Sequence, residues 1–342
     1  MVKKIIHLVK NDYFLTEIIF SKLSSEKIYF YNLTEITKIC ATKNILVNLY
    51  KSRIKPLFLI VIAYIKRKIH SKNDHAIYFG IEDYKGISSC VYKFSFCANQ
   101  AIWLWNPRRT LNISEIEFKI LLITLKITGV QVWTVDYNDS VKYKLNYHPQ
   151  VYSLEFSRQV LNKKLCEELT NPVMFDIFFV GVDKGRLELL NTFAKLLDDA
   201  SLSFSISVLP DKNKHYDECE RLLAKNAMNY DEYLDKLFQT TAILEIVQPG
   251  QGGLTIRTLE ALFYNKKLIT NNESITEYDF YNADNIFIYK EQDCNIDALK
   301  SFLKKNNVII DQSILRKYDI NHLINEILQS PYSSNLNERK SN

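Results

Sequence analysis

Strand-like and helix-like patterns alternate along the sequence, and this alternation constrains the fold more than any other feature. Short apolar runs rich in β-branched and aromatic residues predict strands, and segments with apolar residues every three or four positions predict helices. In the first half the predicted strands are 4–9, 27–33, 75–80, 100–109 and 130–139, the last two running into loops, and the predicted helices are 16–23, 44–69 and 115–129. This order is typical of a parallel sheet whose strands are joined by helical crossovers.

The same alternation begins again in the second half of the chain. The predicted strands there are 174–181, 203–209, 242–247, 266–270 and 285–289, and the predicted helices are 185–200, 229–241 and 315–330. A chain of 342 residues suits two domains of ordinary size. We expect the boundary between 150 and 172. The predicted parts are a Rossmann-like domain over 1–155, a second over 156–314, a closing helix over 315–330 and a frayed tail over 331–342.

Composition and charge exclude several classes of protein. A hydrophobic content of 47% with 24% charged residues is typical of a folded protein. The net charge of +5 is modest, and no zinc-finger, RNA-binding or helix-turn-helix signature occurs, so we expect no nucleic-acid partner. The six cysteines form no C-x-x-C pair, and no histidine stands at ligand spacing from one of them. Free thiols and the absence of a signal peptide predict a cytoplasmic protein.

The segment 51–72 is strongly basic and leaves two interpretations open. It carries seven Lys or Arg residues and no acid, and its apolar centre, 56–64, is about half the length that spans a bilayer. It can lie on an anionic membrane surface, which would place the protein peripherally on the inner face of the plasma membrane. The alternative is an ordinary core helix with solvated basic ends, kinked near Pro56.

Glycine is concentrated in two loops that each follow a predicted strand and precede a predicted helix. Of only eight glycines, Gly250, Gly252 and Gly253 fall within four positions, and Gly181 with Gly185 occupies the other loop. In open α/β sheets, ligands bind beyond the carboxyl ends of the strands. A glycine loop that leads into a helix presents free backbone N–H groups at the positive end of the helix dipole. The pattern therefore predicts two phosphate-binding loops.

Charged residues accompany both loops. Lys184 and Arg186 add two cations to the first loop, which suits a diphosphate. In the second, we expect a helix that begins near 253–255, with Arg257 and Glu260 one turn apart on one face. The alternatives stay open: the first loop can be a plain turn with a solvated edge, and Arg257 with Glu260 a surface ion pair.

The segment 245–270 resembles the donor-binding segment of GT-B glycosyltransferases. A glycine loop there opens a helix with a Glu-Ala dipeptide, followed by a turn and a short strand. The resemblance is closest to bacterial surface-polysaccharide and lipopolysaccharide biosynthesis proteins and to the CgeB-like group. The G-x-x-x-R-x-x-E-A pattern of that group is met by Gly253, Arg257, Glu260 and Ala261. The loop 181–186 is similar to the family's phosphate loop, and 136–152 to its transition between domains.

The resemblance implies a GT-B fold, in which two Rossmann-like domains with parallel sheets face a central cleft. It implies transfer of a sugar from a nucleotide-sugar donor, held by the second domain, to a glycan or lipid-linked glycan acceptor held by the first. Glu260 would bind the ribose, and no metal or other cofactor is expected, since cations can neutralise the diphosphate. The donor-binding residues so predicted are Gly181, Lys184, Arg186, Gln248, Gly250, Gln251, Gly252, Gly253, Leu254, Thr255, Arg257 and Glu260.

The sequence departs from the family in one respect and leaves the catalytic base open. Many retaining GT-B enzymes carry two acids spaced E-x7-E, but Gly252 stands eight positions before Glu260. An inverting enzyme needs a base in the first domain. The candidate bases are Glu82, Asp83 and Asp136, with His7 taken to follow the first strand, and Trp103, Trp105 and Asn106 are candidates for an acceptor pocket or for the core.

Two other classes of protein remain as alternatives. A different nucleotide-using α/β enzyme, such as a dehydrogenase or epimerase, is one, although the first strand and the residues after it lack a G-x-G-x-x-G pattern. The other is a GT-B-shaped subunit without catalysis, which would bind little or no nucleotide sugar alone.

Overall fold

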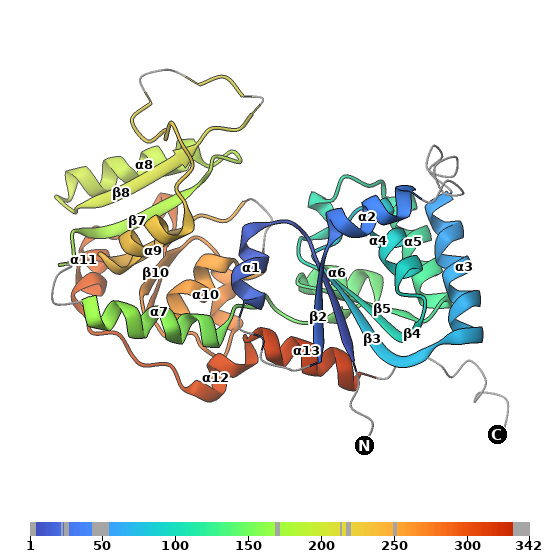
Figure 1. Cartoon of the computed structure of the whole chain (residues 1–342). Coiled ribbons are helices and arrows are strands. Elements are labelled where there is room, and N and C mark those ends of the chain that lie inside the picture. Colours follow the sequence, from blue (N-terminus) through green and yellow to red (C-terminus); the bar gives the residue numbers. More distant parts are fainter. Residues whose placement is uncertain are drawn as a thin grey trace, which may run out of the picture. The chain divides into compact units, whose positions relative to one another are not determined.

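The computed structural model describes residues 5–21, 23, 27–42, 55–167, 172–212, 214–216, 220–248 and 252–330. The chain divides into two compact units (Figure 1). The first unit comprises residues 1–150 and 320–342, and the second comprises residues 151–319. The predicted tail over 331–342 lies outside the described residues.

The first unit is built on a parallel six-stranded sheet in the order β2-β1-β3-β4-β5-β6. Its strands are β1 (Ile6–Lys10), β2 (Ile28–Asn32), β3 (Lys72–Phe79), β4 (Cys97–Leu104), β5 (Val130–Thr134) and β6 (Asn146–Tyr147). Its α-helices are α1 (Phe14–Phe20), α2 (Leu33–Thr42), α3 (Lys55–His70), α4 (Tyr84–Lys93), α5 (Glu115–Ile127), α6 (Tyr137–Tyr143) and α13 (Ile320–Gln329).

Helices cover both faces of this sheet. Side chains of α2, α3, α4 and α5, among them Ile36, Ile60 and Leu121, pack in one core cluster with alternate residues of β1, β3, β4 and β5. The other face carries the intervening strand residues, because successive side chains of a strand point to opposite sides. Phe79 on that face packs edge-to-face against Phe20 of α1, with ring centroids 4.6 Å apart.

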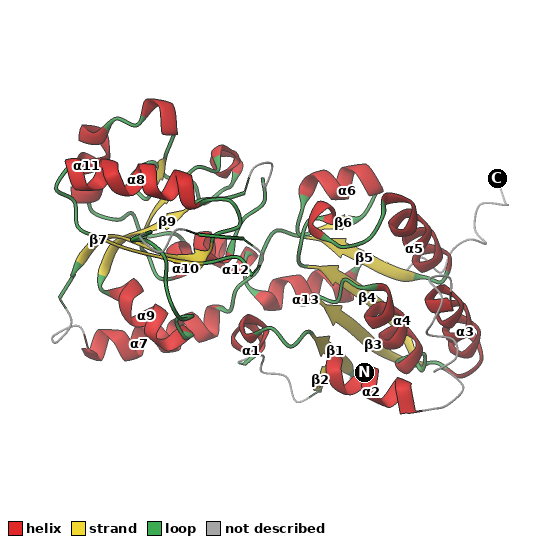
Figure 2. Ribbon diagram, turned by 90° about the horizontal axis from the view of Figure 1, so that it is seen from above, coloured by secondary structure: helices red, strands yellow, loops and turns green. Residues whose placement is uncertain are grey.

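The second unit holds a parallel five-stranded sheet in the order β11-β10-β9-β7-β8. Its strands are β7 (Phe175–Val182), β8 (Phe204–Leu209), β9 (Thr240–Glu245), β10 (Lys267–Thr270) and β11 (Ile286–Ile288). Its α-helices are α7 (Leu154–Glu167), α8 (Leu187–Asp199), α9 (Tyr230–Phe238), α10 (Ile256–Phe263), α11 (Ile296–Lys304) and α12 (Gln312–Lys317). Helices α8 and α11 pack on one face, and Figure 2 shows α7 and α9 on the other.

The prediction of α/β units with parallel sheets is confirmed in both halves, and several elements differ from the prediction. The acidic stretch after β5 begins helix α6 instead of continuing as a loop, because Asp136 caps that helix. Helices α2, α4, α7 and α11 and the short strand β6 were not predicted. In the predicted helix 44–69, residues 43–54 lie outside the described part, and α3 begins at Lys55.

The single predicted helix over 315–330 is wrong, since two helices occupy this region. Helix α12 ends at Lys317 and α13 starts at Ile320. Between them the Tyr318 carbonyl accepts a hydrogen bond from the Tyr152 amide at 2.9 Å. The carboxylate of Asp319 accepts one from the Leu154 amide at 3.1 Å. These bonds tie the chain to the start of the second unit at the point where it returns to the first.

Candidate functional site

The first glycine loop forms a tight turn between β7 and α8. Lys184 and Gly185 follow each other with φ angles of 46° and 78°, both in the left-handed region. Asp183, which is fully buried, accepts hydrogen bonds from the amides of Arg186 at 2.8 Å and Leu187 at 2.7 Å. The side chain of Asp183 therefore already occupies the free amides at the start of α8, which the sequence predicted for phosphate.

The second carboxylate oxygen of Asp183 fastens a neighbouring loop. It accepts hydrogen bonds from the Lys214 amine at 2.7 Å and from the Tyr216 hydroxyl at 2.8 Å. Burial alone would raise the pKa of Asp183, but these bonds outweigh burial and hold the pKa below its ordinary value. Asp183 is thus an ionised anchor that shapes the turn.

Two arginines meet at the carboxyl edge of the sheet. Arg186 is 8% exposed and donates to the carbonyl oxygens of Ile246 at 2.8 Å and Asp183 at 3.1 Å. Arg257, in the first turn of α10, donates to the carbonyl oxygen of Val180. Both guanidinium groups lie over the ring of Phe179, at 5.4 Å and 4.8 Å from its centroid. Backbone carbonyls and an aromatic face thus hold two cations side by side.

Within the described part of the chain, no direct partner neutralises the charges of these two arginines. Among the described residues, neither guanidinium forms an ion pair with a carboxylate. Burial first, and the charge of Arg257 second, lower the pKa of Arg186 to about 10. The pKa of Lys184 is also lowered, by partial burial and then by Arg186 and Arg257. Three cations therefore repel one another here, and an anion would relieve that repulsion.

Gly181 gives the two arginines the space that they need. A Cβ atom at this position would lie 2.6 Å from Nη2 of Arg257 and 3.3 Å from Nη2 of Arg186. Its φ angle is outside the left-handed region, so backbone conformation does not require glycine. The reason for this glycine is the close approach of the guanidinium groups to the end of β7.

The amino terminus of α10 is fixed by a buried acid at the end of β9. Glu245 is fully buried and accepts hydrogen bonds from three threonine hydroxyls, those of Thr255, Thr258 and Thr270. The bonds from Thr258 and Thr270 measure 2.6 Å. Thr255 is the N-cap residue of α10, and Thr258 stands in its first turn. Glu245 therefore locks the helix start, and with it Arg257, against β9 and β10.

The part of the second glycine loop that is described is held from the loop after β10. The Ser274 hydroxyl donates to the carbonyl of Gly252 at 2.7 Å, and the side-chain amide of Asn272 donates to the carbonyl of Gly253 at 3.4 Å. Leu254 is buried. Gln248 is half-buried at the near end of the loop, whereas Gly250 and Gln251 lie outside the described residues.

Glu260 lies in a buried tyrosine network. It is 2% exposed and accepts hydrogen bonds from the hydroxyls of Tyr230, at 2.6 Å, and Tyr233. The Tyr152 hydroxyl joins this network through bonds of 2.6 Å to Tyr230 and 2.8 Å to Tyr264. Burial raises the pKa of Glu260 to about 7, against the lowering effect of the two tyrosines and Arg257. Its predicted contact with a ribose stays a prediction, since both oxygens are engaged here.

The three candidate bases of the first unit have different surroundings. Glu82 follows β3, and its carboxylate accepts hydrogen bonds from the Asn106 amide at 2.6 Å and side chain at 2.8 Å. Burial raises the pKa of Glu82 above its ordinary value. Asp83 and Asp136 are N-caps: they accept bonds from the amides of Gly86 at 2.7 Å and Asp139 at 2.9 Å.

Other candidates from the sequence lie in the core. His7 belongs to β1 itself and does not follow it, which corrects the prediction, and it is 8% exposed. Trp103 and Trp105 pack with Phe79 in a buried aromatic group, at 0% and 8% exposure. Asn106 alone of this group is exposed, and it holds Glu82.

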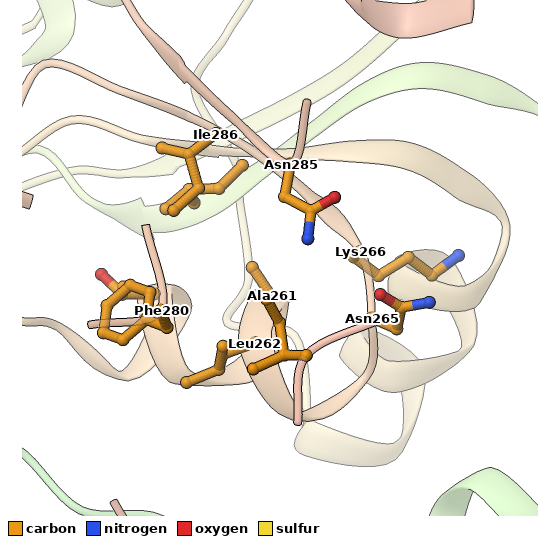
Figure 3. Close-up of a pocket in the computed structure, with 10 residues that line it drawn as sticks. Ala261, Leu262, Asn265, Lys266, Phe280, Asn285 and Ile286 are labelled. Carbon is orange, nitrogen blue, oxygen red and sulfur yellow. The ribbon is translucent and has the colours of Figure 1, made fainter. Parts of the chain in front are cut away.

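A small pocket lies on the far half of α10 from these cations (Figure 3). Ala261, Leu262, Phe280 and Ile286 give it an apolar lining. Figure 3 shows the Lys266 amine directed away from the pocket, where it donates to two backbone carbonyls. The interior has room for a water molecule but not for a sugar. This pocket is therefore not the candidate site.

Sequence reasoning missed the buried residues that hold the loops and the arginines of the site in place. Glu245 ends an apolar strand run, and an acid at the carboxyl end of a predicted buried strand was the signal for it. Asp183 likewise comes directly after the strand run 174–181. Phe179 carried no signal, because a strand phenylalanine is an ordinary core residue.

The fold is that of the GT-B-like class, as comparison with solved structures shows. The chain is similar to a UDP-GlcNAc 2-epimerase from Neisseria meningitidis, solved with UDP-GlcNAc bound. The TM-score is 0.50 at 11% sequence identity, and the match covers 94% of this chain and 99% of that chain. No protein-family model matches the sequence, and no curated protein matches it.

Proposed function

We propose that the protein is a glycosyltransferase that uses a nucleotide-sugar donor. The observation that carries this proposal is the pair of arginines, Arg186 and Arg257, at the carboxyl edge of the second sheet, where no carboxylate of a described residue pairs with either of them. Guanidinium groups bind phosphate oxygens with strong, charge-assisted hydrogen bonds. The start of α10 and the Lys184 amine stand near the same cations, which suits a diphosphate.

The proposed chemistry follows from where charge develops. In sugar transfer the bond between the anomeric carbon and the diphosphate breaks, and negative charge grows on the departing diphosphate. Fixed cations that face this charge stabilise the transition state more than the ground state. The acceptor would be a glycan or lipid-linked glycan of the cell surface, as the resemblance of 245–270 implies. No metal is required for charge neutralisation at this site.

Glu82 is the base that we propose for an acceptor hydroxyl. Asp83 and Asp136 use their carboxylates to cap helices, whereas Glu82 has no such task. Burial moves the pKa of Glu82 upward, in the direction that favours a general base, because such a base works best when its pKa approaches the ambient pH. Its bonds from Asn106 fix the orientation of the carboxylate.

A second candidate function is epimerisation of a nucleotide sugar. The observation that favours it is the GT-B-like fold shared with a UDP-GlcNAc 2-epimerase over nearly the whole of both chains. An epimerase would use the same cations for the diphosphate but would return a donor with changed sugar configuration, without a need for an acceptor. A subunit without catalysis remains a further alternative.

Thermal shift with UDP, GDP, CMP and ADP and their common sugars is the test of the nucleotide site. We expect one nucleoside diphosphate to raise the melting temperature by about 5–10 °C at about 100 times its dissociation constant. EDTA is expected to leave this shift unchanged. A panel without any shift would contradict the proposal.

Product analysis of the selected nucleotide sugar then separates the candidate activities. Transfer yields free nucleoside diphosphate and a glycosylated acceptor, while epimerisation yields an isomeric donor with no acceptor added. Glu82→Gln is expected to slow transfer by about 100-fold or more and to leave nucleotide binding intact. An isomeric donor as the product would replace the transferase proposal with the epimerase one.

A membrane-surface location is also part of the proposal, and two exposed apolar stripes support it. Phe58, Val61, Ile65 and Ile69 of α3 are between 41% and 64% exposed, and Ile116, Ile120, Ile123 and Ile127 of α5 between 44% and 72%. The spacing of three or four residues puts each set on one side of its helix. The two helices are in contact and lie side by side in Figures 1 and 2.

Charge identifies the surface that these stripes would meet. The opposite sides of α3 and α5 cover the sheet, so both stripes point away from it. Exposed Lys66 and Lys68 of α3 and Lys119 and Lys126 of α5 accompany them. A bilayer with anionic head groups complements both features. No helix among the described residues is long and apolar enough to cross a membrane.

Sedimentation with liposomes tests this location. The double variant Ile65→Gln/Ile123→Gln is expected to bind phosphatidylglycerol liposomes about tenfold or more weakly, because two exposed apolar side chains are removed. Ile309→Gln is the matched control, since Ile309 is 83% exposed in the second unit. Equal sedimentation of all three proteins would count against a lipid partner, and loss of a dimer in the double variant would assign the face to a second copy of the chain.

A further inference from the structure

Three potential metal ligands converge in the first unit, whereas the cations described above belong to the second unit. His148 follows β6, and His322 and Glu326 stand one turn apart on α13. Nε2 of His148 lies 3.3 Å from Nδ1 of His322, which in turn lies 3.8 Å from Oε1 of Glu326. One ligand atom from each of the three residues can be chosen so that all lie within 4.8 Å of one another.

Hydrogen bonding prepares the buried member of this group as a ligand. Nδ1 of His148 lies 2.7 Å from the carbonyl oxygen of Pro149. A carbonyl only accepts, so Nδ1 carries the proton, and Nε2 of the neutral ring keeps its lone pair. His148 is 2% exposed, so this lone pair is held inside the first unit. Metal-bound histidines commonly have such a carbonyl partner on the second nitrogen.

The spacing of the two imidazole nitrogens fits a bound ion as well as it fits a hydrogen bond. Bonds of about 2.0–2.1 Å to a tetrahedral Zn²⁺ place two nitrogen ligands about 3.3 Å apart. We propose that His148, His322 and Glu326 bind a divalent transition-metal ion of the Zn²⁺ type. The ion takes the place of the proton between the two nitrogens, and His322 changes tautomer, so that its single proton moves from Nδ1 to Nε2. Two imidazoles and a carboxylate suit Zn²⁺, and a water molecule completes four-coordination.

The position of the site in the chain suggests what the ion does. Gln150 is the last residue of the first unit before the chain enters the second, and Ile320 is the first residue after it returns. His148 stands just before the exit, and His322 stands just after the return. A bound ion would therefore link the segment that leaves the first unit to the segment that returns to it, and would hold α13 on the first unit. This role is separate from nucleotide binding, which the proposed function places in the second unit.

Titration of the untagged, EDTA-treated full chain with Co²⁺ and Zn²⁺ tests the proposal. We expect one equivalent of Co²⁺ to bind with the visible absorption of a nitrogen- and oxygen-ligated site and to be displaced by Zn²⁺. Zn²⁺ is expected to raise the melting temperature, and EDTA to reverse the rise. His322→Ala and Glu326→Gln are each expected to weaken binding about tenfold or more. The side chains of His322 and Glu326 are 40% and 43% exposed, so we expect both variants to fold.

His70→Ala is the matched control, because His70 is an exposed histidine of the same unit outside the group. It is expected to bind both ions like the unmodified chain. Equal affinity of His322→Ala and the unmodified chain would overturn the proposal, as would thiolate charge-transfer bands, which would assign the ion to cysteine. A chain that binds neither ion would show that His148 and His322 share only a hydrogen bond.

Discussion

Arg257→Ala is expected to weaken binding of the selected nucleoside diphosphate by about 10- to 100-fold. A hydrogen bond to a charged group contributes about 1.5–3 kcal/mol, and this variant removes both the bond and the charge. The fold should persist, because Arg257 is half-buried and its described hydrogen bond from the guanidinium goes to one backbone carbonyl. Isothermal titration calorimetry with the diphosphate measures the change directly.

Gly181→Ala is a second variant that tests the position of the guanidinium alone, because it moves this group without removing its charge. Its Cβ would stand 2.6 Å from Nη2 of Arg257, so the guanidinium must shift. We expect a loss of affinity that approaches that of Arg257→Ala. Arg221→Ala is the control, since Arg221 is an exposed arginine of the same unit paired with Asp198. Unchanged affinity in both Arg257→Ala and Gly181→Ala would show that the diphosphate does not bind at this edge of the sheet.

Glu260→Gln is expected to stabilise the second unit above pH 7 and to flatten its dependence on pH. The pKa of Glu260 is raised from 4.5 to about 7 by burial. Between these two pH values the folded chain holds a proton that the unfolded chain has lost, so the free energy of unfolding falls as the pH rises. The full effect is on the order of 3 kcal/mol at 1.36 kcal/mol per pKa unit. Glutamine keeps the shape and an acceptor oxygen but never ionises.

Urea unfolding between pH 5 and pH 8 measures this effect. Circular dichroism follows both units, whereas fluorescence of the three tryptophans, at 103, 105 and 133, reports on the first unit alone. We expect the variant to match the unmodified chain near pH 5 and to be more stable by about 1–3 kcal/mol at pH 8. The unfolding transition of the first unit, followed by tryptophan fluorescence, is expected to be the same in both proteins. Glu273→Gln, at a 67% exposed side chain in the same unit, is the control. Parallel pH profiles for Glu260→Gln and the unmodified chain would refute a buried carboxyl with a raised pKa.

The candidate site was predicted in part, and the limits have a physical cause. The loop after β7 and the helix after the second glycine loop were predicted, because glycine and charge mark such loops in the sequence. Arg186 and Arg257 were both predicted to bind the donor, but their packing on one ring, that of Phe179, was not, since they come together only when β7 and β9 are neighbours in the sheet. The same holds for Glu245, whose three threonine partners come from α10 and β10.

The individual roles of residues also changed between sequence and structure. Asp183 rather than a ligand occupies the start of α8, and Gly181 makes room for side chains rather than for phosphate. Asp83 and Asp136, two candidate bases, are helix caps. Each of these roles depends on where a side chain points, and a one-dimensional pattern does not contain that direction.

The sequence by itself determined the fold class of this protein, because the periods of apolar residues along strands and helices are local properties of the chain. It also placed the glycine loops at the ends of strands. Only the tertiary structure decided which cations lie side by side, which acids stabilise helices and loops, and which acid is available as a base. It alone brought His148 to His322, 174 positions away, because contacts between distant residues arise from sheet order and helix packing.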